Sequence, residues 1–240
     1  MTQRGKFIAI EGIDGSGKGT QAELLAREFA TRGIPCARFS FPRYDSSFGR
    51  LVGRFLNGEF GPLSAVDAHF SALLYAGDRF EAKGALEAEL AAGKIILADR
   101  YVASNLAHQA ARVPAEDRAQ FMAWLRQLEY GIYGLPREDL VIYLRLNPEQ
   151  AYRLVGTKSA RPYTGLTHDL QETDRGHLEQ AAKVYEVLAA ESNWVTIECA
   201  DSQTGGPKTP EEIHRAVMAA VGSRVLRQLS SASTSSLELP

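Results

Sequence analysis

Short apolar runs alternate along this chain with longer segments in which apolar residues recur every three or four positions. The apolar runs predict strands at residues 7–10, 36–41, 95–98, 140–144 and 194–197. The helical period predicts helices at residues 18–32 and at about 46–57, 64–92, 115–133, 147–155, 170–191 and 210–228. Strands that are apolar throughout are typical of a parallel sheet buried on both faces. We therefore expect an α/β fold, with three α/β/α layers and a central five-stranded parallel sheet.

Two segments interrupt this alternation. Residues 156–167 (GTKSARPYTGLT) are polar, basic and rich in Gly and Pro, which fits an ordinary solvated connector. Residues 230–240 (SSASTSSLELP) have low complexity and no apolar period, and we expect them to form a disordered tail. The remainder, residues 1–229, is expected to form one domain.

Composition excludes several classes of protein. The chain has 240 residues, of which 45% are hydrophobic and 23% charged, as in an ordinary globular enzyme. A net charge of −2 gives no argument for a nucleic acid polymer or an acidic membrane as partner. No apolar run approaches the ~20 residues of a membrane span, and the N-terminal segment leads directly into a strand, which leaves no room for a signal peptide. Cys36 and Cys199 lack C-x-x-C spacing, so we expect reduced thiols in the cytoplasm.

Residues 12–20 (GIDGSGKGT) follow the first predicted strand and open the first predicted helix. Their spacing is G-x-x-x-x-G-K, in which glycines let backbone N–H groups converge on a phosphate and the lysine reaches the outer phosphates. The positive end of the helix points at the same anion. We expect a nucleoside triphosphate rather than a simple glycine-rich turn. The binding residues would be Gly12, Ile13, Asp14, Gly15, Ser16, Gly17, Lys18, Gly19 and Thr20.

Gly19 departs from this pattern, because a Ser or Thr that binds Mg²⁺ usually follows the lysine. Thr20 comes one position later. We therefore expect Thr20 or water to complete the coordination of Mg²⁺, which keeps several waters in such sites.

Two further strand ends carry polar residues. In IILADRY, Asp99 and Arg100 follow an apolar run, at the sheet edge where open parallel sheets bind ligands. Asp99 is suited to Mg²⁺ or its waters and Arg100 to a phosphate oxygen, although a structural Asp–Arg pair would look the same. In SFPRY, Pro42 fixes a turn after Phe41, and Arg43 then projects near that edge. This fits a flat, phosphorylated ligand or a surface turn.

A predicted helix contains LLYAGDRF, in which Tyr75 and Arg79 are four residues apart and share a face. Tyr75 could stack on a base while Arg79 contacts a phosphate or carbonyl. An ordinary surface pair would have the same spacing.

Taken in order, EGIDGSGKGTQ, FPRY, LLYAGDRF and DRYVASNLAHQ resemble the thymidylate kinase family of nucleoside monophosphate kinases. The resemblance covers roughly residues 5–225. It implies a P-loop NTPase fold and the transfer of the ATP γ-phosphoryl group to dTMP, giving dTDP and ADP, with Mg²⁺. It also implies a homodimer formed through a helical face.

The resemblance assigns roles to single residues. Asp14 would meet the sugar 3′-hydroxyl of dTMP, and Asp99 and Arg100 would lie at Mg²⁺ and the acceptor phosphate. His108 stands where an aromatic residue is common. The other residues expected to bind dTMP are Phe41, Pro42, Arg43, Tyr75, Arg79, Ser104, Asn105 and Gln109.

The family also implies a catalytic cation, either inside the phosphate loop or in a mobile lid. Residues 13–16 contain no Arg or Lys, so the resemblance points to a lid at about residues 156–168, with Lys158 and Arg161 as candidates. Together with Lys18 and Arg100 these are the expected catalytic residues. Arg153 is a further cation just before the lid.

Two alternatives remain at this point. The GKGTQ ending is shared with adenylate kinase-like proteins, so the acceptor could be AMP or UMP/CMP, although FPRY and DRYVASN argue against this. A regulatory P-loop module is the other alternative. A GTPase would need an N/T-K-x-D motif, and residues 157–160 (TKSA) lack its Asp.

Overall fold

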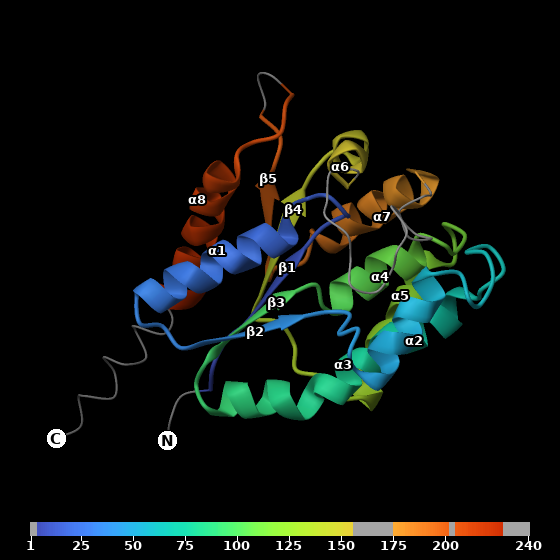
Figure 1. Cartoon of the computed structure of the whole chain (residues 1–240), viewed down its shortest axis with the longest axis horizontal. Helices are drawn as coiled ribbons and strands as arrows, with labels where there is room; N and C mark the ends of the chain where they lie inside the picture. The colour runs from blue at the N-terminus through green and yellow to red at the C-terminus, as the bar shows by residue number, and fades with distance from the viewer. Residues whose placement is uncertain (1–3, 156–174, 202–204, 228–240) are drawn as a thin grey trace.

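The computed structural model describes residues 4–155, 175–201 and 205–227. Its centre is a five-stranded parallel sheet with the strand order β2-β3-β1-β4-β5 (Figure 1). All five predicted strands are confirmed, with shifts of one residue at their carboxyl ends. The strands are β1 (Phe7–Glu11), β2 (Cys36–Ser40), β3 (Ile95–Asp99), β4 (Leu140–Arg145) and β5 (Trp194–Glu198).

Helices cover both faces of the sheet, which confirms the three-layer α/β/α fold (Figure 1). One face carries α1 (Lys18–Thr31) and α8 (Pro210–Val221), which contact each other. α8 continues into a π-helical turn, η2 (Gly222–Leu226). Near the carboxyl ends of the strands, α6 (Pro148–Val155) lies close to the phosphate loop. The elements on the other side are α2 (Ser47–Leu56), α3 (Ala68–Ala91), α4 (Val102–Ala110), α5 (Arg118–Arg126), π-helical η1 (Gln127–Ile132) and α7 (Arg175–Leu188).

The sequence pattern did not predict α4. All nine of its residues are buried, so the helix has no polar face and its period is hidden. The single helix predicted at 115–133 is also wrong in part, because α5 passes into the π-helical turn η1 at Gln127. Other predicted helices begin later than expected where a side chain caps them, as Asp67 caps α3.

The inner strands of the sheet form the core, because helices cover both of its faces. β1 is buried along its whole length, and β3 and β4 are buried except at their last residues. A smaller apolar cluster joins α2 to α3 through Val52, Phe55 and Leu74. Because the inner strands are buried, they position the first residues of the loops that follow their carboxyl ends.

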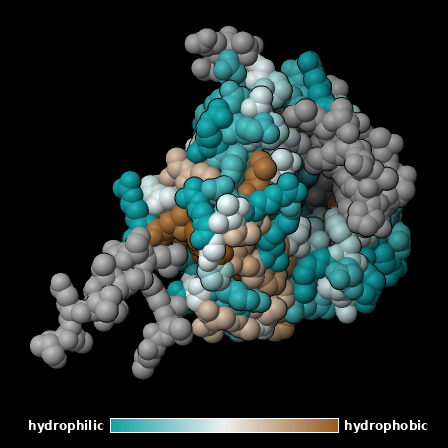
Figure 2. Space-filling view, turned by 60° about the vertical axis from the view of Figure 1, so that its left-hand side comes forward, coloured by the Kyte–Doolittle hydropathy of each residue, from teal (hydrophilic) through white to brown (hydrophobic). Residues whose placement is uncertain are grey.

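The outer surface is mostly polar on the side that Figure 2 shows, with hydrophobic residues between hydrophilic ones. In the part of the chain described, no helix is both long and apolar enough to cross a membrane. The expected lid at about 156–168 and the expected tail at 230–240 lie outside the described residues.

Candidate active site

The phosphate loop joins β1 to α1 and has the backbone that its glycines predict. Gly12, Gly15 and Gly17 have φ values of 145°, 88° and 89°, a region that other residues rarely adopt. At Gly15 a Cβ would also lie 2.4 Å from the carbonyl oxygen of Ala151 in α6, so no side chain fits there. Gly17 is the N-cap of α1, and no side chain hydrogen-bonds at this cap. The positive end of the α1 dipole faces the loop, where it would favour a bound anion.

Lys18 and Ser16 complete the loop. The Lys18 side chain is buried, and its Nζ donates to the carbonyl oxygen of Ile13 at 2.9 Å, so the ammonium lies over the loop. Ser16 Oγ is buried and has no hydrogen-bond partner within the described chain. A bound phosphate would satisfy both groups.

The sheet register brings Asp99 to the same loop. Ile10 in β1 is paired with Asp99 in β3, and a Cβ built on Gly19 would lie 3.2 Å from Asp99 Oδ2. A side chain at position 19 would therefore crowd the Asp99 carboxylate, a contact that glycine avoids. Thr20, the other expected metal ligand, is exposed in the first turn of α1.

Arg100 connects two of the other expected site residues. Its Nη2 donates to Asp14 Oδ1 at 2.5 Å and its Nη1 to Ser104 Oγ at 3.2 Å. Burial disfavours its charge, but Asp14, Asp99, Glu11 and Tyr185 together outweigh this and raise the pKa of Arg100, which is therefore a permanent cation. Its backbone has φ 67°, an uncommon value for a residue with a side chain and one often found at functional sites.

Glu11, which the sequence reasoning did not single out, holds this corner together. It is fully buried at the end of β1, and its Oε1 accepts from the backbone N–H groups of Tyr101 (2.7 Å) and Ser104 (3.2 Å). Its Oε2 accepts from Ser104 Oγ (2.6 Å) and from the hydroxyl of Tyr185 in α7 (2.9 Å). Glu11 thus caps α4, whose own N-cap offers no side-chain hydrogen bond. A charged residue that ends an apolar strand was the available signal.

Arg43 and Phe41 lie beside this corner, at the end of β2. The Phe41–Pro42 peptide bond is cis, and Phe41 packs on Tyr101 with ring centroids 5.7 Å apart. Arg43 is held by Asp78 of α3: its backbone N–H donates to Oδ2 at 2.8 Å and its Nε to Oδ1 at 3.1 Å. The Asp78 side chain is 1% exposed, so a buried carboxylate fixes the position of Arg43. Asp78 belongs to the LLYAGDRF motif and was also missed.

Between α3 and α4 lie the residues expected to recognise the base. Asn105 Nδ2 donates to the carbonyl oxygen of Ala72 (3.0 Å) and to Glu129 Oε1 (2.9 Å), while its Oδ1 is buried without a partner within the described chain. Arg79 makes a buried pair with Glu129 through Nε (2.5 Å) and Nη2 (2.7 Å). Arg79 is therefore bound to η1, and any contact with a ligand must come from its remaining edge. Tyr75 stands edge-on to Phe55, with centroids 6.4 Å apart.

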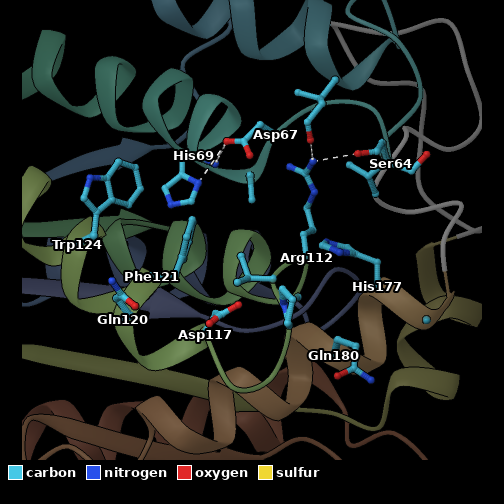
Figure 3. A pocket seen from close by; sticks show the side chains of 17 residues that line it. Ser64, Asp67, His69, Arg112, Asp117, Gln120, Phe121, Trp124, His177 and Gln180 are labelled. Carbon is cyan, nitrogen blue, oxygen red and sulfur yellow. Dashed lines mark hydrogen bonds and ion pairs between the residues drawn. The ribbon is translucent and has the colours of Figure 1, made fainter.

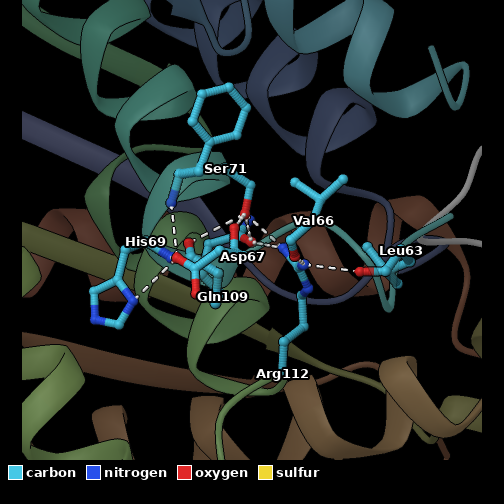
Figure 4. A network of polar contacts seen from close by, with 9 residues as sticks. Leu63, Val66, Asp67, His69, Ser71, Gln109 and Arg112 are labelled. Carbon is cyan, nitrogen blue, oxygen red and sulfur yellow. Dashed lines mark hydrogen bonds and ion pairs between the residues drawn. The ribbon is translucent and has the colours of Figure 1, made fainter. Parts of the chain in front are cut away.

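Gln109 takes part in a separate polar network (Figure 4). Its Oε1 accepts from Ser71 Oγ at 2.8 Å and from Arg112 Nη1 at 2.9 Å. The structure thus uses the Gln109 carbonyl to join α4 to α3 instead of leaving it open to a pyrimidine.

A family model described as thymidylate kinase matches residues 10–205, well over half of the chain. The chain belongs to the thymidylate kinase family. The activity of this family is the ATP-dependent phosphorylation of dTMP to dTDP, so the predicted enzyme class is confirmed.

Individual relatives agree with the thymidylate kinase family model. Thymidylate kinase of Mycobacterium tuberculosis (strain CDC 1551 / Oshkosh) is 33% identical over 198 residues, which cover 80% of this chain and 90% of the relative. A probable thymidylate kinase of Pyrococcus abyssi (strain GE5 / Orsay) is 38% identical over 152 residues, which cover 62% and 69%. The solved structure of thymidylate kinase from Candida albicans has a TM-score of 0.72 and 20% identity over 92% of each chain, which shows the same P-loop NTPase fold.

His108 lies between Arg100 and His177 in this member of the thymidylate kinase family. It is buried in α4, with Nε2 3.4 Å from Arg100 Nη1 and Nδ1 3.3 Å from His177 Nε2. Burial and the Arg100 cation hold the pKa of His108 well below its usual value, so the ring is neutral and can accept from Arg100. Lys158 and Arg161 lie outside the described residues, and Arg153 pairs with Glu149 at 2.6 Å.

A cavity of about 1020 Å³ lies between the loop before α3, the α4–α5 connection, α5 and the start of α7, and His177 is one of its lining residues (Figure 3). None of the residues expected to bind ATP or dTMP lines it. Arg112 borders this cavity and also belongs to the network that joins α4 to α3.

Proposed function

We propose that ATP binds on residues 12–20 and dTMP binds between β2, α3 and α4, so that the γ-phosphoryl group passes between them at Arg100. The observation that carries this placement is the buried, unpartnered Oδ1 of Asn105. Because Nδ2 donates to two fixed acceptors, the orientation of the amide is set and Oδ1 must meet a donor. The N3–H of thymine is such a donor. The N3 of cytosine is an acceptor and would leave Oδ1 unsatisfied, which argues against a CMP kinase.

Phosphoryl transfer needs two phosphates held in line and their charge neutralised. In the proposal Lys18 contacts the outer phosphates of ATP, and Arg100 contacts the acceptor phosphate while Asp14 orients it. In the same proposal Asp14 also meets the sugar 3′-hydroxyl of dTMP. Arg43 and Phe41 bound the acceptor phosphate from the β2 side, and Lys158 and Arg161 remain the candidates for the further cation.

The residues present fit a magnesium ion. Asp99 supplies a carboxylate beside the loop, and Gly19 leaves room next to it. Within the described chain no group of three or more His, Cys, Asp or Glu side chains could hold a metal ion by itself. In the proposal, water and phosphate oxygens supply the other ligands of Mg²⁺. When bound, Mg²⁺ supplies positive charge to the phosphate oxygens. The role of Asp99 is then to orient the ion or its waters.

An assay of ADP formation with a panel of monophosphates tests this function. We expect dTMP to be the preferred acceptor and dUMP a weaker one, because one methyl group is worth only about 1–3 kcal/mol. dCMP and AMP should be poor acceptors. Asn105→Ala should raise KM for dTMP while leaving KM for ATP unchanged. A variant with an unchanged KM for dTMP, or a wild-type enzyme that prefers AMP, would contradict the proposal.

A homodimer is proposed from an exposed apolar face of α3. Phe70, Leu73 and Phe80 lie on one side of this helix and are 47%, 38% and 49% exposed. Ile132, 69% exposed, lies near them, because Phe80 packs on Tyr133 at 4.8 Å. Such a contiguous face is typical of an interface. Leu73→Glu should convert a dimer to a monomer in light scattering, whereas Val187→Glu, at a 63% exposed site on α7, should not.

The location proposed from the sequence is the cytoplasm. Cys36 and Cys199 are both free thiols, which fits a reducing compartment.

A further inference from the structure

Arg112 follows the end of α4 and joins three segments of the chain (Figure 4). Its Nη1 donates to Ser71 Oγ of α3 at 2.5 Å and to Gln109 Oε1 of α4 at 2.9 Å. Its Nη2 donates to the carbonyl oxygens of Leu63, at 2.9 Å, and of Val66 in the loop before α3. The planar fork of an arginine is needed to reach four acceptors in two directions, and a lysine ammonium cannot do this.

These acceptors are neutral, and no ion pair within the described chain joins Arg112 to a carboxylate. Burial lowers the pKa of Arg112, although the group stays charged at neutral pH. Burying the Arg112 charge among neutral acceptors therefore costs free energy. What the hydrogen bonds achieve is structural, because they fix the start of α3 against the end of α4.

The same guanidinium reaches the wall of the proposed base site. Its Cζ lies 5.8 Å from the ring centroid of Phe55 in α2, and Phe55 stands edge-on to Tyr75. On the α4 side, Asn105 is one helical turn before Gln109, which Arg112 holds. Arg112 thus contacts Phe55, which packs against Tyr75. It also holds Gln109, which lies one turn after Asn105 on α4.

We propose that Arg112 is a positioning residue for base recognition, which sets the spacing of α3 and α4 and thereby the aim of Asn105 and Tyr75. The inference rests on the proposed base site between these helices. Arg112 also borders the cavity of about 1020 Å³, so shortening its side chain would enlarge an existing space and would not empty the main core (Figure 3). The folded enzyme is therefore expected to survive the substitution.

The test compares Arg112→Lys and Arg112→Met with Arg118→Lys. Arg118 is a matched control, because it also donates to a loop carbonyl, that of Val113 (3.1 Å), and to a glutamine, Gln180 (2.9 Å), but on the side away from α3. Both Arg112 variants should raise KM for dTMP about tenfold and narrow the preference for dTMP over dUMP, with kcat and KM for ATP changed by less than about twofold. Ser71→Ala, which removes one acceptor, should shift KM for dTMP in the same direction.

An unchanged KM for dTMP in the Arg112 variants would overturn the inference, as would equal losses for both substrates, which would indicate a merely structural role. Asn105→Ala measured in parallel separates the two proposals. If it leaves KM for dTMP unchanged, the base site is misplaced. If it raises KM and the Arg112 variants do not, only the role of Arg112 fails.

Discussion

The Oδ2 atom of Asp99 lies 3.2 Å from the point where the side chain of residue 19 would begin, and residue 19 is a glycine. The two residues come from different motifs, and the pairing of β1 with β3 places them together. A side chain at position 19 would push on the carboxylate proposed to orient Mg²⁺, because few real Cβ contacts are this short.

Gly19→Ala is accordingly expected to lower turnover severalfold and to raise the Mg²⁺ concentration needed for half-maximal activity. Stability should change little, since residue 19 lies in the first turn of α1, where replacing Gly by Ala gains at most the roughly 0.5–1 kcal/mol of a helix interior. Gly84→Ala in α3 is the control, because nothing lies within 4 Å of a Cβ there. Wild-type Mg²⁺ dependence in Gly19→Ala would show that Asp99 does not act through the metal.

Glu11 gives a second prediction, for the geometry around Arg100. Glu11→Gln keeps the size of the side chain but loses the charge at the start of α4 and replaces an acceptor oxygen by an NH₂ group. We expect a loss of about 1–3 kcal/mol in the free energy of unfolding and a fall in kcat/KM for dTMP, because Ser104 then no longer holds Arg100 in place.

Tyr185→Phe is the matched control for Glu11→Gln. It removes a hydroxyl that donates to Glu11 and lies 3.1 Å from Ser104 Oγ, but it leaves the Glu11–Ser104 and Ser104–Arg100 hydrogen bonds in place. It should therefore cost about 1 kcal/mol of stability and leave turnover intact. Denaturant unfolding and steady-state kinetics on the same preparations would decide. Equal kinetic losses in the two variants would contradict a specific role of Glu11 in positioning Arg100.

A third prediction concerns stability in acid. Because the pKa of His108 is lowered in the folded state, the folded enzyme binds fewer protons there than the unfolded chain, and stability falls as pH drops below about 6.5. His108→Gln retains an acceptor for Arg100 but does not titrate. The wild type should therefore lose more stability than the variant between about pH 7 and about pH 5 in denaturant unfolding. Parallel curves for the two proteins would exclude this contribution.

The three inner strands β1, β3 and β4 could be predicted because both faces of the sheet are covered there, which makes these strands apolar almost throughout. The same burial hid α4, where no polar face marks the period. The phosphate loop could be predicted as well, since its glycines are required by local backbone conformation. Gly19 could not be explained from the sequence, because its reason is the position of Asp99 on a neighbouring strand.

The sequence analysis missed the carboxylates that hold the site residues in place. Glu11, Asp78 and Glu129 each bind residues on other elements, and Glu11 and Tyr185 are 174 positions apart. No spacing in the sequence reports such contacts. Arg79 and Gln109 show the complementary difficulty: a motif indicates that a residue belongs to the site, but only the structure shows that Glu129 and Arg112 already bind them.

Glu138 provides the last prediction, at the opposite end of the sheet from the active site. It precedes β4, accepts from the Tyr130 hydroxyl at 2.7 Å, and burial raises its pKa to about 7. The folded state then binds more protons than the unfolded chain between about pH 4.5 and about pH 7, so this residue makes stability fall as pH rises through that range. Glu138→Gln keeps an acceptor for Tyr130 and removes the charge. The variant should therefore be more stable than the wild type at about pH 8, by about 1–2 kcal/mol, and equal to it near pH 4.5. Urea unfolding at both pH values measures the difference, and a variant less stable than the wild type at the higher pH would show that Glu138 is ionised and well paired there.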